Sequence, residues 1–172
     1  MGRYFSHFPI LSGKGPPPPG YQVSYSFKPL MLLGLNLPVE ISTASLYRGP
    51  PANMPLSSIV VMAHFDTGAS ITSIDINLAI HLNLVSTGQS TNHTASGPQE
   101  MPNFAIDLSF PNTKLMPFQN LHISSCRLDF DLKKNANNKN LPQNFGMLIG
   151  RDIMSTWNII WDGPTSTVII ND

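Results

Sequence analysis

The sequence is poor in cysteine: Cys126 is the only one among 172 residues. A single cysteine excludes an intramolecular disulfide framework and any zinc site built on cysteines. A reducing compartment is the simplest setting for such a chain, so we expect it in the cytoplasm. The histidines show no metal-ligand spacing with one another or with carboxylates, so we expect neither a metal nor another cofactor.

Charge and long apolar runs are also scarce. Charged residues make up 12% of the chain and the formal net charge is zero, which leaves no basic field to attract nucleic acid. No apolar run approaches the roughly 18 residues that a membrane-spanning helix needs. Residues 5–12 lack the charged flank and the length of a secretory signal. We therefore expect no nucleic-acid partner and no membrane insertion, and a peptide is the more plausible partner.

The chain is long enough for one domain with a core, since a domain of this size buries about two thirds of its unfolded surface. Residues 1–27 contain a polyproline stretch bracketed by glycines, Gly13 to Gly20, which favours an extended, solvated conformation. This segment is interpreted as a tail or linker, or as a pro-segment removed by self-processing. Residues 28–172 are predicted to form the folded domain.

Many short strands and little helix are predicted, which indicates a closed all-β barrel. The predicted strands cover 29–35, 39–46, 58–65, 84–90, 101–110, one or two within 115–132, 147–149, 158–161 and 167–170. Short helices are predicted near 75–82 and 151–156, and the asparagine-rich and lysine-rich segment 133–145 is predicted to be a mobile loop. Segment 91–98 is a polar connection tipped by glycine.

An acid is delivered into a turn at the end of the predicted strand 58–65. The apolar run leads into Asp66-Thr67-Gly68, followed by Ala69 and Ser70. Downstream, Met147-Leu148-Ile149-Gly150-Arg151-Asp152 joins another apolar strand to a short helix. Alone, the triplet would be read as an ordinary β-turn and the second segment as a buried strand.

Together the two segments resemble the retropepsin family, the single-domain aspartic proteases of retroviruses and their cellular and bacterial relatives. The resemblance covers roughly residues 28–172. It implies a retropepsin-like barrel in which Asp66 is catalytic. It also implies supporting roles for Thr67, Gly68 and Ala69 in the turn, and for Leu148, Ile149 and Gly150 beside it.

Peptide hydrolysis without a metal needs one group to take a proton from water and another to give one to the carbonyl oxygen. Two carboxyl groups about 3 Å apart that share one proton do both, as aspartic proteases establish. Only one Asp-[Thr/Ser]-Gly occurs in this chain. We therefore expect the second Asp66 to come from a second copy across a two-fold axis, which makes the active form a homodimer.

The resemblance also implies the substrate-binding residues. The flap corresponds to segment 91–98 and includes Ala95, Ser96 and Gly97. His64, Ser70, Phe145 and Met147 are candidates for pocket walls around an extended peptide, although a hydrogen-bonded histidine facing protein or solvent remains open for His64. Residues 167–172 are expected at the dimer interface.

One position departs from the family. Ser70 stands where the family has the acidic partner of the arginine that corresponds to Arg151. Arg151 is therefore expected to pair with Asp152 or across the dimer interface.

Two other functions remain open. The first is a non-catalytic, dimeric adaptor that keeps the fold and binds peptides or acts in the ubiquitin system. The second is the protease segment of a transposon or phage polyprotein. The complete Asp-Thr-Gly favours an aspartic endopeptidase over an adaptor.

Overall fold

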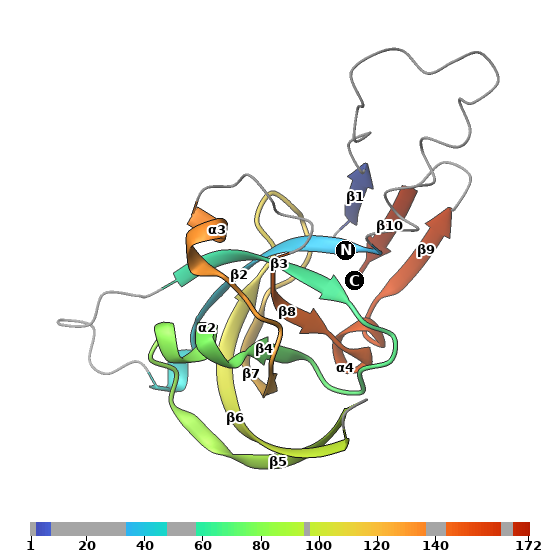
Figure 1. Ribbon diagram of the computed structural model, residues 1–172. Helices are drawn as coiled ribbons and strands as arrows, with labels where there is room; N and C mark the ends of the chain where they lie inside the picture. Colours follow the sequence, from blue (N-terminus) through green and yellow to red (C-terminus); the bar gives the residue numbers. More distant parts are fainter. Residues whose placement is uncertain (1–2, 8–33, 48–57, 95–96, 137–143, 163–166) are drawn as a thin grey trace.

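The computed structural model describes residues 3–7, 34–47, 58–94, 97–136, 144–162 and 167–172 (Figure 1). Within these residues, short strands alternate with a few short helices. In chain order the elements are β1 (Arg3–His7), β2 (Asn36–Thr43), the 3-10 helix η1 (Ser45–Tyr47), β3 (Ser58–Phe65), β4 (Ser73–Asp75), α2 (Ile76–His81), β5 (Ser86–Thr94), β6 (Gly97–Ser109), β7 (Phe118–Cys126), α3 (Leu132–Ala136), β8 (Phe145–Ile149), α4 (Arg151–Met154), β9 (Asn158–Asp162) and β10 (Thr167–Asn171).

Seven strands form one sheet in the order β2-β3-β8-β4-β7-β6-β5. β2 also pairs antiparallel with β6, from Glu40 opposite Ser109 to Thr43 opposite Ile106, and this pairing closes six of the strands into a barrel. β5 lies outside the ring and extends it as a hairpin with β6 (Figure 1). The prediction of a closed all-β barrel with short helices is confirmed.

The barrel core is made by strand residues that alternate between interior and exterior, as the two-residue period of a strand requires. On β2, Leu37, Val39 and Ile41 are fully buried. On β6, Ile106 and Leu108 are fully buried and Phe104 is buried. An aromatic group around Trp157 closes one side of the core, with the Phe110 ring 5.2 Å and the Phe65 ring 6.0 Å from it.

The predicted helix at 75–82 is confirmed as α2. Asp75 caps it by accepting hydrogen bonds from the backbone N–H groups of Asn77 and Leu78 at 2.9 and 3.3 Å. α4 lies within the predicted helix 151–156. α3 (Leu132–Ala136) lies mostly within the segment 133–145, which was predicted to be a loop from its asparagine and lysine content. Its first turn is stabilised by Asp131, which accepts from the N–H groups of Lys133 and Lys134.

A second, three-stranded antiparallel sheet has the order β1-β10-β9 and extends to one side of the barrel (Figure 1). β9 and β10 confirm the predicted hairpin of 158–161 with 167–170. The pairing of β1 with β10 corrects one part of the prediction, because residues 3–7 belong to a strand rather than to an unpaired tail. The polyproline stretch lies outside the described residues. The expected role of 167–172 in a dimer interface stays a prediction.

Two strand boundaries also differ from the prediction. β2 begins at Asn36 and runs through Pro38, which faces Met62 of β3, so the predicted break at this proline is wrong. β5 and β6 reach farther than predicted, and Asn92 pairs with Gln99 inside the predicted polar connection. The hydrogen bonds of strand pairing outweigh the low strand propensity of these polar residues.

None of the helices in the described residues is long and apolar enough to cross a membrane.

Candidate active site

The Asp66 turn is fixed to the barrel by β8. β3 pairs in parallel with β8, with Phe65 opposite Ile149, and the N–H of Asp66 donates to the carbonyl of Ile149 at 3.0 Å. The chain then turns back, since Ala69 N–H donates to the Asp66 carbonyl at 3.1 Å. Within the turn, the N–H of Gly68 donates to Oδ1 of Asp66 at 2.8 Å. The carboxylate is therefore held in one orientation by backbone atoms.

Two glycines permit close approach at this turn. A Cβ on Gly68 would lie 3.0 Å from Oδ1 of Asp66. A Cβ on Gly150 would lie 2.6 Å from the carbonyl carbon of Ile71 and 2.7 Å from the nitrogen of Thr72. The Gly150 contact is with backbone, which cannot swing aside, so any side chain there would separate β8 from the chain that leaves the turn.

A buried polar bridge joins the same two segments. The hydroxyl of Thr72 accepts from the N–H of Gly150 at 3.0 Å and donates to Oδ1 of Asp152 at 2.8 Å. The Asp152 carboxylate also accepts from the N–H of Thr72, at 2.9 Å to Oδ2, and from the N–H of Ile153 at 2.9 Å. The sequence did not indicate this bridge, because Thr72 and Asp152 are 80 residues apart.

Arg151 does not pair with Asp152, contrary to one of the two expectations. Its Nη1 donates instead to the carbonyl oxygens of Thr67 at 2.7 Å and Gly68 at 3.4 Å. Its backbone N–H donates to the Ala69 carbonyl at 3.0 Å. The guanidinium thus holds the outer side of the Asp66 turn by backbone contacts and needs no acidic residue at the position of Ser70.

A hollow of about 720 Å³ opens above this turn. Asp66, Gly68, Ala69 and Ser70 line its base, and Leu148 lies beside them. One wall comes from the β5–β6 hairpin, with Thr91, Asn92 and Met101. Another part of the lining comes from the end of β7, with Cys126, Arg127 and Leu128. Asp66 is the only carboxylate among the described residues that line the hollow.

The other predicted substrate-binding residues lie in different places. Met147 is fully buried in the core, so it does not form a pocket wall in this protomer. Phe145 lies outside the hollow and packs against His64, with ring centroids 5.0 Å apart. Gly97 is the first residue of β6, and Ala95 and Ser96 lie outside the described residues.

His64 has the partner that the alternative interpretation proposed. Its Nδ1 is 2.8 Å from Oδ1 of Asn36, and the ring is half-buried against Phe145. Burial lowers the pKa of His64 below its usual 6.5, and the negative charge of Asp66 opposes that shift. The neutral ring, with Nδ1 carrying the proton, therefore suits this position.

Side chains of the hairpin are hydrogen-bonded to β7. Asn92 Nδ2 donates to Oγ of Ser124 and to the carbonyl of Ser125, both at 2.9 Å. The hydroxyl groups of Ser90 and Ser124 lie 3.3 Å apart, and within the hairpin Ser90 Oγ donates to Oδ1 of Asn103 at 2.8 Å. These contacts orient the inner face of the hairpin over Asp66, and no local sequence pattern indicates them.

Cys126 contributes a neutral group to the lining of the hollow. Burial, reinforced by the nearby negative charges of Asp75 and Asp66, raises the pKa of this thiol to about 12. The described residues contain no group of three or more His, Cys, Asp or Glu side chains placed to hold a metal ion. The chemistry that this site offers is therefore that of a fixed carboxylate at the base of an open hollow.

The chain is similar to solved structures that are distant in sequence. A retropepsin-like aspartic protease from Rickettsia conorii is similar over 80% of this chain and 93% of its own, with 18% sequence identity and a TM-score of 0.41. No protein-family model matches the chain, and its sequence matches no curated protein. The roles of individual residues therefore rest on this chain's own geometry.

Proposed function

We propose that this chain is one subunit of a homodimeric aspartic endopeptidase. The observation that carries the proposal is the Asp66 carboxylate, fixed by the Gly68 N–H at the base of a hollow that is open to a ligand. Thr67 and Gly68 complete the turn, and Gly150 lets β8 approach it. An ordinary surface turn would need neither a hollow beside its aspartate nor a glycine, here Gly150, packed against the backbone that follows the turn.

The chemistry requires a second carboxyl group beside the first. The described part of the protomer does not supply it. Both Asp75 oxygens are used inside the protein, by the N–H groups at the start of α2 and by that of Leu128 at 2.8 Å. Asp152 is held by Thr72. A second Asp66, brought by a two-fold axis, would complete the pair.

In that dimer, one carboxylate removes a proton from water while the protonated partner donates one to the carbonyl oxygen of the peptide bond. The β5–β6 hairpin acts as the flap, and the peptide binds extended beneath it through backbone hydrogen bonds. Ser70 and Leu148, which line the hollow near Asp66, contact the side chains that flank the scissile bond.

The test is to incubate the purified protein with a proteome-derived peptide library, with and without pepstatin. We expect cleavage that pepstatin suppresses and that is lost in Asp66→Asn. Sedimentation of both proteins should show the same dimer. Peptides that bind but are never cleaved at any pH would instead support the adaptor function.

A further inference from the structure

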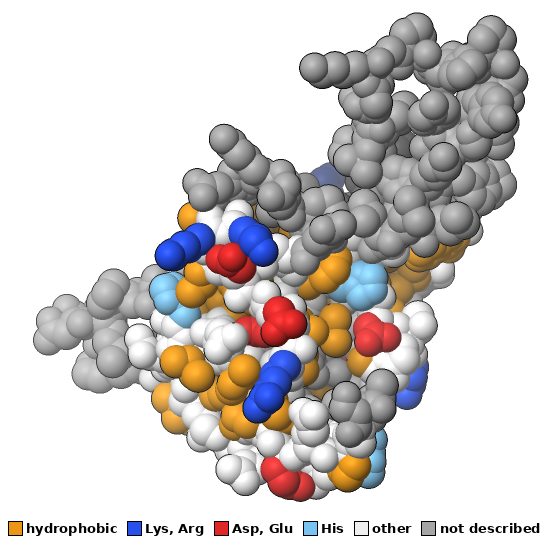
Figure 2. Space-filling model, viewed as in Figure 1, with side chains coloured by type: hydrophobic (Ala, Val, Ile, Leu, Met, Phe, Trp, Pro, Cys, Tyr) orange, Lys and Arg blue, Asp and Glu red, His pale blue; other side chains and the backbone are white. Residues whose placement is uncertain are grey.

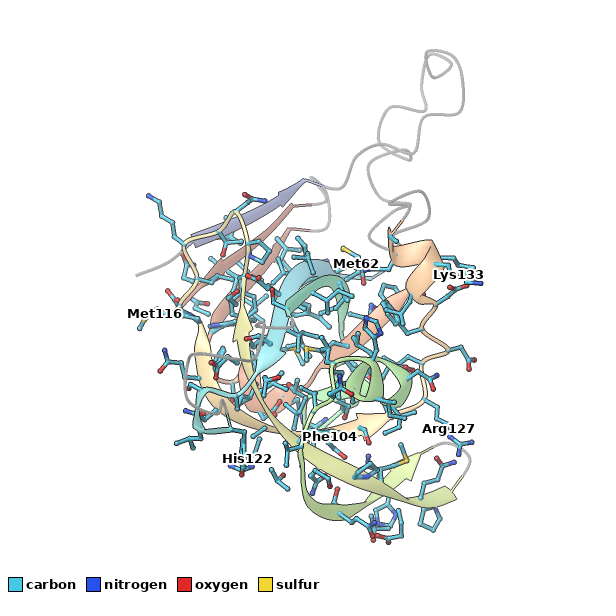
Figure 3. The ribbon with its side chains drawn as sticks, turned by 90° about the vertical axis from the view of Figure 1, so that its left-hand side faces the viewer. Met62, Phe104, Met116, His122, Arg127 and Lys133 are labelled. Atoms are coloured by element: carbon cyan, nitrogen blue, oxygen red, sulfur yellow. The ribbon has the colours of Figure 1, made fainter. Side chains whose placement is uncertain are left out.

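A basic side chain faces the same hollow as Asp66. Arg127 follows the end of β7, is exposed, and lines the hollow together with residues of the β5–β6 hairpin. Figure 3 shows it at the same end of the barrel as that hairpin. Among the described residues, Arg127 has no hydrogen-bond or ion-pair partner. Its guanidinium is thus available to a ligand in the hollow.

Other charges around the hollow are few. Cys126, next to Arg127, stays a neutral thiol because its pKa is raised to about 12. His93 is the other basic side chain of the lining, and Asp66 is the only acidic one among the described residues. More widely, acidic and basic side chains are scattered over the face in Figure 2 rather than gathered into a patch of one sign. Arg127 is therefore a local cation and not part of a basic field.

Dimer formation changes the balance of charge at the site. If two Asp66 carboxyl groups share a proton, the pair carries one negative charge. Two Arg127 side chains, one from each protomer, carry two positive charges. The assembled cleft then has a net positive charge, which favours an anionic group on the peptide.

The surroundings of Arg127 suit a carboxylate carried by a peptide. Leu128 and Met101 give the hollow apolar surface, and Gln99 adds an amide. A guanidinium presents parallel N–H donors that match the two oxygens of a carboxylate. Partial exclusion of water by a bound peptide would strengthen that contact relative to an exposed ion pair.

We propose that Arg127 is a specificity-determining residue that selects peptides with an aspartate or glutamate side chain near the scissile bond. This inference rests on the proposed endopeptidase function. It names the chemistry of the substrate, which the Asp66 turn alone leaves open.

Cleavage tests the inference directly. In a cleavable peptide, glutamate, glutamine and lysine are placed in turn at each position around the scissile bond, and kcat/KM is measured. We expect one position at which glutamate is preferred by about fivefold to tenfold, the worth of one partly shielded charge-assisted hydrogen bond. Arg127→Gln should abolish that preference, and Arg127→Glu should reverse it toward lysine. Lys114→Gln, which removes a positive charge outside the hollow, should leave the preference unchanged.

A binding measurement separates this inference from the proposed function. Asp66→Asn, with and without Arg127→Gln, is titrated with the same labelled peptides by fluorescence anisotropy. Preferential binding of the glutamate peptide that depends on Arg127 supports the inference even if the wild type cleaves nothing. Equal binding of glutamate and glutamine peptides at every position, or no binding of any peptide, overturns it even if cleavage is found.

Discussion

Replacing Thr72 by valine tests whether the buried bridge beside the Asp66 turn holds the site together. Thr72 is fully buried, and valine keeps its shape while exchanging the hydroxyl for a methyl group. The N–H of Gly150 then loses its acceptor, and Oδ1 of Asp152 loses one donor. The Gly150 N–H is buried away from water, whereas Asp152 is partly exposed and keeps the N–H donors of Thr72 and Ile153.

The cost comes from these two losses. Leaving a buried donor without a partner costs about 1–3 kcal/mol, and a lost hydrogen bond to a carboxylate adds about 1 kcal/mol. We expect Thr72→Val to lower the free energy of unfolding by about 2–4 kcal/mol. With a urea m-value of about 2 kcal/mol per molar, the midpoint should fall by about 1–2 M.

The assay is urea unfolding at pH 7, monitored by tryptophan fluorescence at one fixed protein concentration, because the stability of the proposed dimer would depend on concentration. Thr156→Val is the matched control. The Thr156 hydroxyl donates only to the nearby carbonyl of Ile153, at 2.7 Å, from an exposed position. That variant should lose less than about 1 kcal/mol. If Thr72→Val loses no more than the control, the bridge does not stabilise the protein and the reasoning is refuted.

Three further predictions concern the same region. Asp66→Asn should reduce cleavage more than about 100-fold without changing the fold or the dimer, since the amide keeps the shape but cannot act as a base; residual activity above that level in a peptide assay would refute the assignment. Gly150→Ala should destabilise the protein by at least about 2 kcal/mol in urea, because its Cβ meets backbone, whereas Gly146→Ala, which meets side chains of the core, should cost less. Because the pKa of His64 is lowered in the folded state, unfolding takes up a proton as the pH falls through 6.5, so stability should decline there. His64→Gln should decline less between about pH 7.5 and 5 in the same urea assay, and an equal decline would contradict this account.

The features that the sequence predicted are mostly local ones. The helical spacing of Ile74, Leu78 and Leu82, together with Ser73 and Asp75 as the two possible caps, predicted α2, and all of these signals lie within a few residues. The Asp66 turn is equally local, since Gly68 and Ala69 make its hydrogen bonds. Strand alternation and turn residues were enough to predict the barrel, because closure results when several such strands need partners.

The features that the sequence did not predict depend on contacts between distant segments. β1 pairs with the far end of the chain, and no pattern in residues 3–7 indicates that partner. Arg127 has no neighbour in the sequence that marks it as part of a cleft. The polar composition of 91–98 predicts a connection between strands, and asparagine disfavours strands. In the structure Asn92 belongs to β5, and its side chain donates hydrogen bonds to Ser124 and Ser125 of β7. Such long-range polar contacts outweigh local propensity.

The same distinction shows what separates the Asp66 turn from an ordinary Asp-Thr-Gly turn. The triplet alone needs only its own backbone, and Gly68 satisfies it. Gly150 lies far along the chain, yet its missing side chain decides whether β8 can pack against Ile71 and Thr72. A surface turn places no such demand on a distant residue. The informative pattern is therefore Asp66-Thr67-Gly68 together with Gly150, the glycine that follows a later buried strand. Gly150 lets β8 pack closely against the chain that leaves the turn, and Asp66 lines the hollow on the other side.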